Sequence, residues 1–312
     1  MKQLKTICVC FVMLLWAALS STVQGQDPSG TVLLNSGYEM PLFGIDCSAF
    51  PAARAEELVY TALREGFRSL QLHAGTAVEE AVGRGIRRAI EDGLISREDL
   101  FLSAVFSAVE RENVSLLIQN TLTRLGVNYL DLMTERQSAY DKDASGWQAM
   151  EQASEAGLIR SLGMAGFSDV RNVDLFLDTA VTFQPAVLQL RVYPYEQRTD
   201  MKEHLAESGI VLTAEDPLGG NGEEQILFAD SAVSVAATWH QKTSAQIILR
   251  WQLQSGNVVM LSPENEAEIA EYADILNFSL NADEMAQIDA LDRQQTLIDF
   301  ESEEVAPVEE WF

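Results

Sequence analysis

A short apolar run near position 70 carries two side chains with chemical potential. Gln71 and His73 lie two residues apart, and because side chains alternate between the faces of a strand, both would point to the same side. The imidazole of histidine titrates near neutral pH and can act as an acid or a base. His73 is therefore a candidate for proton transfer, although a histidine satisfied within a pocket or core is the interpretation that we favour.

A cysteine with an acidic neighbour is the second candidate. Cys47 is flanked by Asp46 and Ser48. A nearby carboxylate raises the pKa of a thiol and lowers its reactivity, so we favour a packed or inert thiol over a nucleophile. His204 and His240 fall in segments expected to form outer helices, and they have no companions at metal-ligand spacing. They are interpreted as surface residues, and no metal site is predicted.

The pattern along the chain predicts the scaffold that positions these residues. From about residue 30, short apolar strands alternate with amphipathic helices, which is typical of a parallel α/β fold. Eight strands are expected at Leu42–Ile45, Ser69–Leu72, Phe101–Ala104, Tyr129–Met133, Ser161–Met164, Val187–Leu190, Val211–Ala214 and Val258–Met260. Helices are expected at Arg54–Arg64, Val78–Asp92, Val114–Leu125, Trp147–Ala156, Val173–Thr179, Met201–Ser208, Ser244–Leu253 and Glu266–Leu276. Such alternation predicts a (β/α)8 TIM barrel.

The segments at either end of this pattern complete the predicted domain. An N-terminal β-hairpin is expected from Thr31–Leu34 and Tyr38–Pro41. An additional helix at Asn281–Leu291 would pack outside the barrel. The sequence thus predicts one domain over residues 30–295, followed by an acidic C-terminal tail at residues 296–312.

Motifs along this scaffold resemble those of the aldo-keto reductase family. Residues 66–80 are similar to its strand-and-loop signature G-Y-R-H-I-D-T-A-x-x-Y-G-N-E, with the Gly-aromatic-Arg opening and the closing Glu in place. Further matches follow in the family's order at residues 33–41, 97–101, 125–132, 157–163, 184–187 and 217–219. The resemblance covers about residues 30–295. It implies a barrel that reduces a carbonyl with NADPH, but a fold does not by itself establish a function.

The four catalytic positions that the resemblance implies all carry other side chains. The family's Asp falls on Gln71, its Tyr on Thr76, its Lys on Val105 and its His on Arg136. A threonine hydroxyl is a far weaker acid than a phenol, and a valine has neither charge nor donor. The reductase mechanism therefore has no proton donor in place, and we predict no catalytic residues.

The cofactor positions implied by the resemblance are altered as well. The Ser-Asn pair that holds the nicotinamide amide becomes Ala165-Gly166, and the Tyr on which the nicotinamide stacks becomes Glu215. The residues that bind the adenosine 2′-phosphate fall on Ser262, Pro263 and Glu268. A glutamate repels a phosphate instead of binding it. Of the nicotinamide contacts only Gln189 is retained, so no cofactor is expected.

Charged and polar residues are expected to gather where the strands end. This predicted ligand pocket consists of Asp46, Cys47, Gln71, His73, Arg136 and Glu215. His73 and Arg136 could form a substitute acid–base pair there. Drift after loss of selection for catalysis explains the same residues equally well.

The N-terminus and the net charge bear on compartment and partners. Residues 1–25 read as a signal peptide, with Lys2 and Lys5 before an apolar stretch that is too short to span a bilayer comfortably; an uncleaved anchor is the alternative. The leader holds two lysines and no acid, so its loss takes the net charge from −26 to −28. A surface this acidic excludes nucleic acid as a partner. The sequons at Asn113 and Asn277 are open to glycosylation in a secretory lumen.

Two functional hypotheses follow from the sequence. The first is an exported aldo-keto reductase-like pseudoenzyme, in the secretory pathway or outside the cell, that binds an unknown small-molecule or protein ligand or has a structural role, with no membrane contact beyond the signal peptide. The alternative is a divergent NADP-dependent oxidoreductase that reduces aldehydes or ketones with a rearranged site. The second hypothesis requires NADP(H), which makes cofactor binding the observation that separates the two.

Overall fold

Eight parallel strands close into a barrel in the computed structural model, which describes residues 30–107, 113–137, 143–179, 182–220 and 222–293. The ring runs in the order β10, β3, β4, β5, β6, β7, β8, β9 and back to β10. Its strands are β3 (Phe43–Asp46), β4 (Ser69–His73), β5 (Phe101–Ser107), β6 (Leu130–Arg136), β7 (Ile159–Ala165), β8 (Val187–Arg191), β9 (Val211–Glu215) and β10 (Val258–Leu261). The prediction of a (β/α)8 barrel is confirmed.

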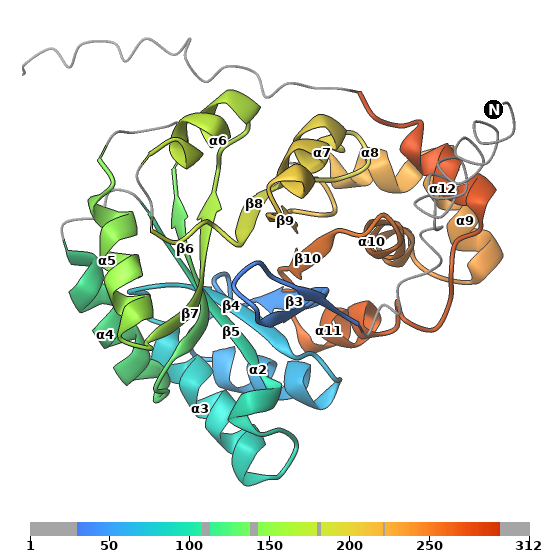
Figure 1. Cartoon of the computed structure of the whole chain (residues 1–312). Coiled ribbons are helices and arrows are strands. Elements are labelled where there is room, and N and C mark those ends of the chain that lie inside the picture. The colour runs from blue at the N-terminus through green and yellow to red at the C-terminus, as the bar shows by residue number, and fades with distance from the viewer. Residues whose placement is uncertain (1–29, 108–112, 138–142, 180–181, 221, 294–312) are drawn as a thin grey trace, which may run out of the picture.

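Helices surround this barrel because the outer side of each strand is apolar. In β4, Leu70 and Leu72 are fully buried in the main core, while Gln71 between them points to the other face, into the barrel. The surrounding helices are α2 (Ala55–Arg64), α3 (Glu79–Glu91), α4 (Val114–Leu125), α5 (Ser145–Glu155), α6 (Val170–Leu177), α7 (Thr199–Glu207), α10 (Ser244–Gln254) and α11 (Glu266–Ala273) (Figure 1). The core therefore lies mainly between the strand ring and the helices.

The predicted hairpin covers the end of the barrel at which the strands begin, which we call the base. Its strands β1 (Thr31–Leu33) and β2 (Glu39–Pro41) pair antiparallel. At its turn, Asn35 Nδ2 donates to the carbonyl of Pro185 at 2.9 Å, and the hydroxyls of Ser36 and Ser161 are 2.7 Å apart. These bonds attach the hairpin to the entry of β7 and to the segment before β8.

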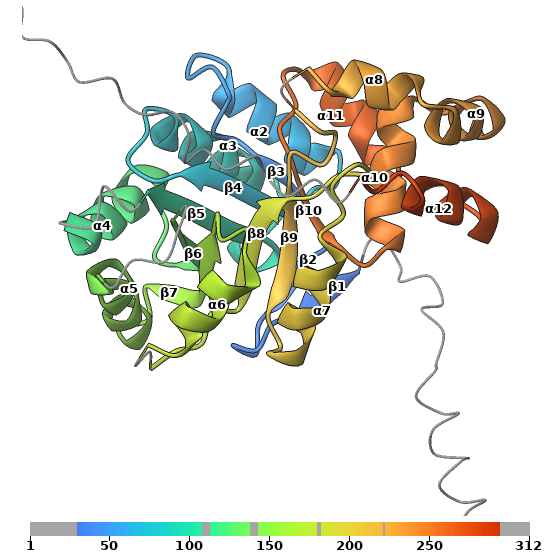
Figure 2. The same cartoon turned by 90° about the horizontal axis from the view of Figure 1, so that it is seen from above.

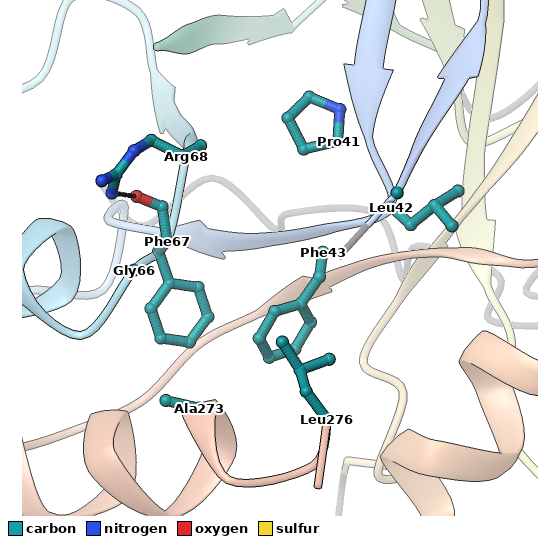
Figure 3. Close-up of a pocket in the computed structure, with 9 residues that line it drawn as sticks. Pro41, Leu42, Phe43, Gly66, Phe67, Arg68, Ala273 and Leu276 are labelled. Atoms are coloured by element: carbon teal, nitrogen blue, oxygen red, sulfur yellow. Dashed lines mark hydrogen bonds between the residues drawn. The ribbon is translucent and has the colours of Figure 1, made fainter. Parts of the chain in front are cut away.

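A small apolar pocket also lies at the base. The rings of Phe43 and Phe67 stack with centroids 4.7 Å apart, and Leu276 lies beside Phe43 (Figure 3). The cavity among these side chains has a volume of about 110 Å³. It is too small for most ligands, whose pockets measure roughly 300–1,000 Å³.

Two helices were not among the predicted ranges, namely α8 (Glu224–Ala229) and α9 (Ser231–His240). Serine, threonine and β-branched residues, which are weak helix formers, make up much of α9. It is stabilised instead by the N-cap Asp230, whose side chain accepts from the amide of Ala232 at 3.0 Å, and by burial of Val233, Ala236 and Ala237. Its spacing of three and four residues between buried positions was the available signal.

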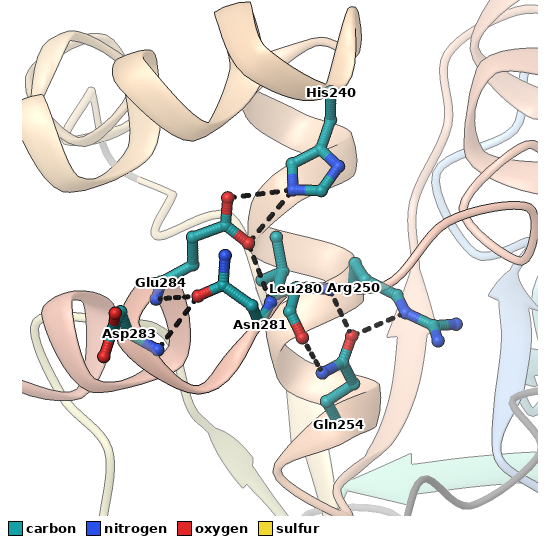
Figure 4. A network of polar contacts seen from close by, with 7 residues as sticks. All are labelled: His240, Arg250, Gln254, Leu280, Asn281, Asp283 and Glu284. Carbon is teal, nitrogen blue, oxygen red and sulfur yellow. Dashed lines mark hydrogen bonds and ion pairs between the residues drawn. The ribbon is translucent and has the colours of Figure 1, made fainter.

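The added helix α12 (Ala282–Asp289) packs on α9, as expected of a helix outside the barrel. The Asn281 side chain caps it by accepting from the amides of Asp283 and Glu284, and His240 Nε2 lies 3.0 Å from the Glu284 carboxylate (Figure 4). Gln254 in α10 donates to the carbonyl of Leu280 at 2.9 Å. Seen from above, α8, α9 and α12 lie together on one side of the barrel (Figure 2).

All eight strands end beyond their predicted ranges, and β5 and β6 do so by three residues each. β5, β6 and β7 have seven residues each, so Val105 and Arg136 lie within strands. The expected ranges stopped at the end of each apolar run, but the alternation of side chains continues through Thr134, Glu135 and Arg136. The predicted signal peptide and acidic tail lie outside the described residues. Within the described ranges, no helix has the length and apolar character needed to cross a membrane.

Candidate ligand site at the barrel mouth

The carboxyl ends of the parallel strands meet at one end of the barrel, which we call the mouth. Asp46 ends β3, His73 ends β4, Arg136 ends β6 and Glu215 ends β9. In enzymes with this architecture the active site is built at this end. The structure therefore brings these sequence-predicted residues to the end of the barrel where a ligand is expected.

A chain of hydrogen bonds crosses the barrel interior beneath the mouth. Gln189 Nε2 donates to Gln71 Oε1 at 3.0 Å, and Gln71 Nε2 donates to Asp46 Oδ2 at 3.3 Å. The strands β4 and β8 are four positions apart in a ring of eight, so the bond between the two glutamines joins opposite walls. Gln71 and Gln189 are only 3% and 1% exposed. The amide of Gln189, the single predicted nicotinamide contact, is thus already bound within the protein.

An ion pair spans part of the mouth above this chain. Arg136 Nη1 donates to Glu215 Oε2 at 3.0 Å, and Nη2 donates to Oε1 of the same carboxylate. Burial lowers the pKa of the Arg136 guanidinium, but the hydrogen bond and charge of Glu215, together with the charges of Asp46 and Asp216, outweigh burial and raise this pKa above its usual value. Arg136 is therefore permanently charged and does not serve as a proton donor.

The positions of the family's phenol and lysine offer no acidic proton. Thr76 Oγ1 donates to the carbonyl of His73 at 2.7 Å, which closes a local turn. Val105 is fully buried in β5. Both residues therefore serve the fold at this end of the barrel.

Cys47 and His73 differ in their surroundings. Cys47 is fully buried, and burial followed by the charge of Asp46 raises the pKa of its thiol well above the usual value. This environment favours the inert interpretation. His73 is half-buried, and within the described part of the chain no hydrogen bond to its ring is found. It forms no bond with Arg136, whose guanidinium is held by Glu215, so the predicted acid–base pair is not assembled.

The two outer histidines are each paired with a carboxylate. His204 Nε2 lies 2.8 Å from Asp174 Oδ1, and His240 contacts Glu284. His240 is more enclosed than expected of a surface residue, with 16% of its side chain exposed, because α12 covers it. Across the described ranges, no three His, Cys, Asp or Glu side chains gather where they could hold a metal ion.

The position of the family's nicotinamide-binding asparagine is occupied by a glycine that the backbone requires. Gly166 has φ +91°, and a Cβ built there would lie 2.4 Å from the carbonyl oxygen of Gln137. A side chain at this position needs the backbone to move. Ala165 before it is fully buried and has no polar group to offer an amide.

In the region where the 2′-phosphate is expected, a carboxylate of the protein itself accepts the available hydrogen bonds. Glu268 in the first turn of α11 accepts from the backbone amide of Glu264 at 2.8 Å and from Asn265 Nδ2 at 2.9 Å. A bound anion would use such donors at a helix N-terminus. Glu268 therefore occupies the position of an anion and repels another one.

The neighbouring cavity is acidic too. It has a volume of about 160 Å³, and Asp216, Glu224, Ser262 and Tyr272 contribute to its walls. Burial raises the pKa of Tyr272, and the nearby carboxylates of Glu268, Glu271 and Glu264 raise it further. Phosphates of a dinucleotide would meet negative charge on several sides here. The residues at both ends of the expected cofactor site therefore do not fit NADP(H).

Sequence analysis overlooked Asp216, which adds a carboxylate beside Arg136. It adopts φ +44°, an uncommon conformation for a residue other than glycine. Its charge contributes to the raised pKa of Arg136. The available signal was its place directly after Glu215 at the end of a strand.

Known proteins with related sequences agree with this architecture. The model of the Aldo/keto reductase family matches residues 40–293. The NAD(P)H-dependent D-xylose reductase I,II of Candida tropicalis is 29% identical over 300 residues, covering 84% of this chain and 92% of that protein. Human aldo-keto reductase family 1 member C3 is 31% identical over 295 residues, covering 84% of this chain and 91% of that protein.

A solved structure shares the same fold. The crystal structure of a Bombyx mori aldo-keto reductase in complex with NADP has a TM-score of 0.76 and 25% sequence identity, covering 87% of this chain and 95% of that one. The fold defines a (β/α)8 barrel with its candidate site at the carboxyl ends of the strands. The chain belongs to the aldo-keto reductase family.

Proposed function

We propose that the protein is an exported, catalytically inactive member of the aldo-keto reductase family that binds a small-molecule or protein ligand at its mouth or acts as a structural protein. The observation that carries this proposal is the ion pair between Arg136 and Glu215. The family resemblance assigns these two positions to the histidine that orients the substrate and to the tyrosine that stacks on the nicotinamide. Here the two side chains bind each other.

The loss of the reaction follows from the combined substitutions. A general acid contributes about 10²–10⁴ to a rate, and members of a catalytic unit fail together instead of additively. Thr76 is bound to a backbone carbonyl and Arg136 to a carboxylate. No group at the family positions can protonate a developing alkoxide.

The charge of the mouth restricts what binds there. Asp46, Glu215 and Asp216 lie close enough to the guanidinium of Arg136 to raise its pKa, and the nearby Arg191 at the end of β8 is paired with Glu196. This excess of negative charge favours a neutral or cationic ligand over an anion. The proposed ligand therefore differs in charge from a dinucleotide phosphate.

Export is supported by the predicted leader and by the positions of the sequons. Asn113 and Asn277 are both exposed, as glycosylation requires. Cys47 is fully buried, so an oxidising lumen would not readily cross-link the folded protein. The test is secretion of the full-length chain from eukaryotic cells, followed by glycosidase treatment. Failure of the chain to reach the medium or a secretory organelle would contradict export.

Cofactor binding tests the inactive state directly. The chain without its leader is titrated with NADPH and with NADH, with tryptophan fluorescence and melting temperature as readouts. We expect neither saturable quenching nor a rise in melting temperature at about 1 mM cofactor, a concentration at which micromolar binding would stabilise the fold by several kcal/mol. Saturable binding in the micromolar range would overturn the proposal.

A divergent oxidoreductase remains the second candidate, because the related Bombyx mori structure contains NADP and the ring of His73 has no hydrogen-bonding partner in the described chain. This candidate predicts NADPH oxidation with aldehydes or ketones, lost in His73→Ala. The control is Thr238→Ala on the outer helix α9, which leaves the mouth intact. Absence of turnover in the unaltered protein would exclude this candidate.

Restoration of the four catalytic side chains gives a stricter test. The quadruple variant Gln71→Asp, Thr76→Tyr, Val105→Lys and Arg136→His is expected to remain inactive, because Glu215, Gly166 and Glu268 still oppose the cofactor. Circular dichroism must first show that the variant folds, since Val105→Lys introduces a charge at a fully buried position. Measurable NADPH oxidation by the folded variant would contradict our account of the cofactor site.

A further inference from the structure

A second cavity lies at the base, at the opposite end of the barrel from the mouth. It has a volume of about 330 Å³ and is bordered by the hairpin turn, the start of β7, the segment before β8 and the ends of α5 and α7. Pockets for small ligands generally measure about 300–1,000 Å³. The cavity is therefore large enough for a small molecule.

Several residues that line this base cavity carry hydroxyl or amide groups, beside an apolar surface that includes Leu162 and Phe183. Ser154, Thr182 and Ser208 contribute hydroxyls at its rim, and Gln184 contributes an amide. Ser161 is buried and Ser36 in the hairpin turn is exposed, and their hydroxyls lie 2.7 Å apart. A hydroxyl both donates and accepts, and an amide does so through separate atoms. These groups match a ligand that itself carries several hydroxyls.

Among the described residues that line the base cavity there is no carboxylate, although the chain has 47 acidic residues. Its single charged residue is Arg160, whose Nη1 donates to Asp131 Oδ1 at 2.9 Å. At the wall formed by Thr182 and Phe183, the backbone amides of these two residues donate to the Glu151 carboxylate at 2.5 and 2.9 Å. The positive charge is thus balanced, and these two amides are not available to an anion.

The helix ends beside the cavity also disfavour an anion. Ser154 lies in the last turn of α5, and Ser208 is the C-cap of α7. The C-terminal end of a helix carries partial negative charge. Phe183, 37% exposed, adds an apolar surface at the rim, and an aromatic face packs well against the C–H groups of a ring. Charge and shape therefore both point to a neutral ligand.

We propose that the base cavity binds a neutral polyhydroxylated molecule of the size of a monosaccharide or cyclitol. The ring lies against Phe183, its hydroxyls exchange hydrogen bonds with Gln184 and the serine hydroxyls, and Arg160 donates from the side. This binding is independent of the mouth and of any cofactor. It therefore does not depend on whether the protein is an active reductase.

Saturation-transfer NMR on the chain without its leader tests the proposal. The probes are D-glucose, D-galactose, D-mannose and myo-inositol, each added alone, and at least one should bind with a dissociation constant of about 1–10 mM, which is typical for a weak ligand. Absence of transfer to all four at roughly 50 mM would overturn the proposal. Binding of sulfate or citrate that displaces the sugar would overturn the inference that the ligand is neutral.

Two variants locate the binding. Ser208→Trp places a large side chain at the rim from an exposed position, and it should weaken binding at least tenfold. Ser231→Trp makes the same change at an exposed position on α9 away from the cavity and should leave binding unchanged. Gln184→Ala removes the amide without filling space and should weaken binding several-fold. Equal affinity in Ser208→Trp and Ser231→Trp would place the ligand elsewhere and refute the base site.

Discussion

The two ends of this barrel use their polar groups differently. At the mouth, several side chains that could serve chemistry are bound to one another, as in the ion pair of Arg136 with Glu215 and the hydrogen bond of Gln189 to Gln71. At the base, charged groups stabilise the strand entries, and a neutral polar cavity remains beside them. In this architecture the mouth carries the chemistry and the base carries stability.

The proposed loss of catalysis would concern the mouth alone. The ion pairs and hairpin contacts of the base form without a cofactor. At the mouth, Arg136 and Gln189 are bound within the protein, whereas catalytic preorganisation requires donors that are free to bind a substrate. Four predictions test this contrast, from the largest expected effect to the smallest.

Asp131 at the base should contribute the most to stability. Its carboxylate accepts from Arg97 at 2.8 Å, from Arg160 at 2.9 Å and from the backbone amide of Leu102 at 2.9 Å. Asp131→Ala leaves two guanidiniums without this carboxylate and should lower the free energy of unfolding by about 3–5 kcal/mol. Urea unfolding followed by tryptophan fluorescence measures the loss.

The control for this substitution is Glu266→Ala, which removes an exposed partner of Arg54. An exposed ion pair contributes at most about 1 kcal/mol. Equal losses in the two variants would show that the base does not depend on its buried carboxylate.

Gly166 at the mouth should show the next largest effect. Gly166→Ala combines a left-handed backbone with a Cβ that would lie 2.4 Å from the Gln137 carbonyl oxygen, and it should cost about 3 kcal/mol. Gly157→Ala is the matched control, because φ is +75° and no atom lies within 4 Å of its added Cβ; it should cost about 1 kcal/mol. Thermal unfolding compares them. Similar losses would mean that residue 166 tolerates a side chain.

Cys47 should react slowly because its thiol is buried at the mouth. Its pKa is raised first by burial and then by Asp46, so fewer thiolates form at any given pH. At about pH 8, labelling by a disulfide reagent should be at least tenfold slower in the folded protein than in urea. Asp46→Asn removes only the smaller cause and should leave labelling slow. Rapid labelling of the native chain without its leader, in which Cys47 is the one remaining cysteine, would identify Cys47 as a reactive thiol after all.

The ion pair across the mouth should contribute least to stability. With 33% of the Arg136 side chain and 20% of the Glu215 side chain exposed, solvent weakens their attraction, and the coupling should be about 1 kcal/mol or less. A double-mutant cycle of Arg136→Met and Glu215→Gln measures it. A coupling of several kcal/mol would mean that the pair is a structural element like Asp131.

The strands were predictable because each is an apolar run with polar flanks, and all eight predicted ranges overlap the observed strands. The helices α8 and α9 were not predicted, because α9 depends on its cap Asp230 and on burial against α10 and α12 more than on helix propensity. The ends of β5, β6 and β7 were also set by pairing with neighbouring strands, which extends beyond the apolar core of each run.

The candidate site was predictable as a set of residues and not as a set of contacts. The family resemblance placed Gln71, Arg136 and Glu215 at one end of the barrel, since strand order determines which ends meet. It did not indicate that Gln71 binds Gln189 or that Arg136 binds Glu215. Nor did it reveal that Glu268 binds its own helix N-terminus or that the hairpin leaves a cavity at the base.

The sequence by itself determined the barrel, its N-terminal hairpin and the side-chain types at the family's catalytic positions, because strand periodicity and residue identity are local properties of the chain. Only the tertiary structure decided which of these side chains bind each other. Partners such as Arg136 and Glu215 lie on strands separated by two others in the ring, so they meet only after the sheet has closed on itself.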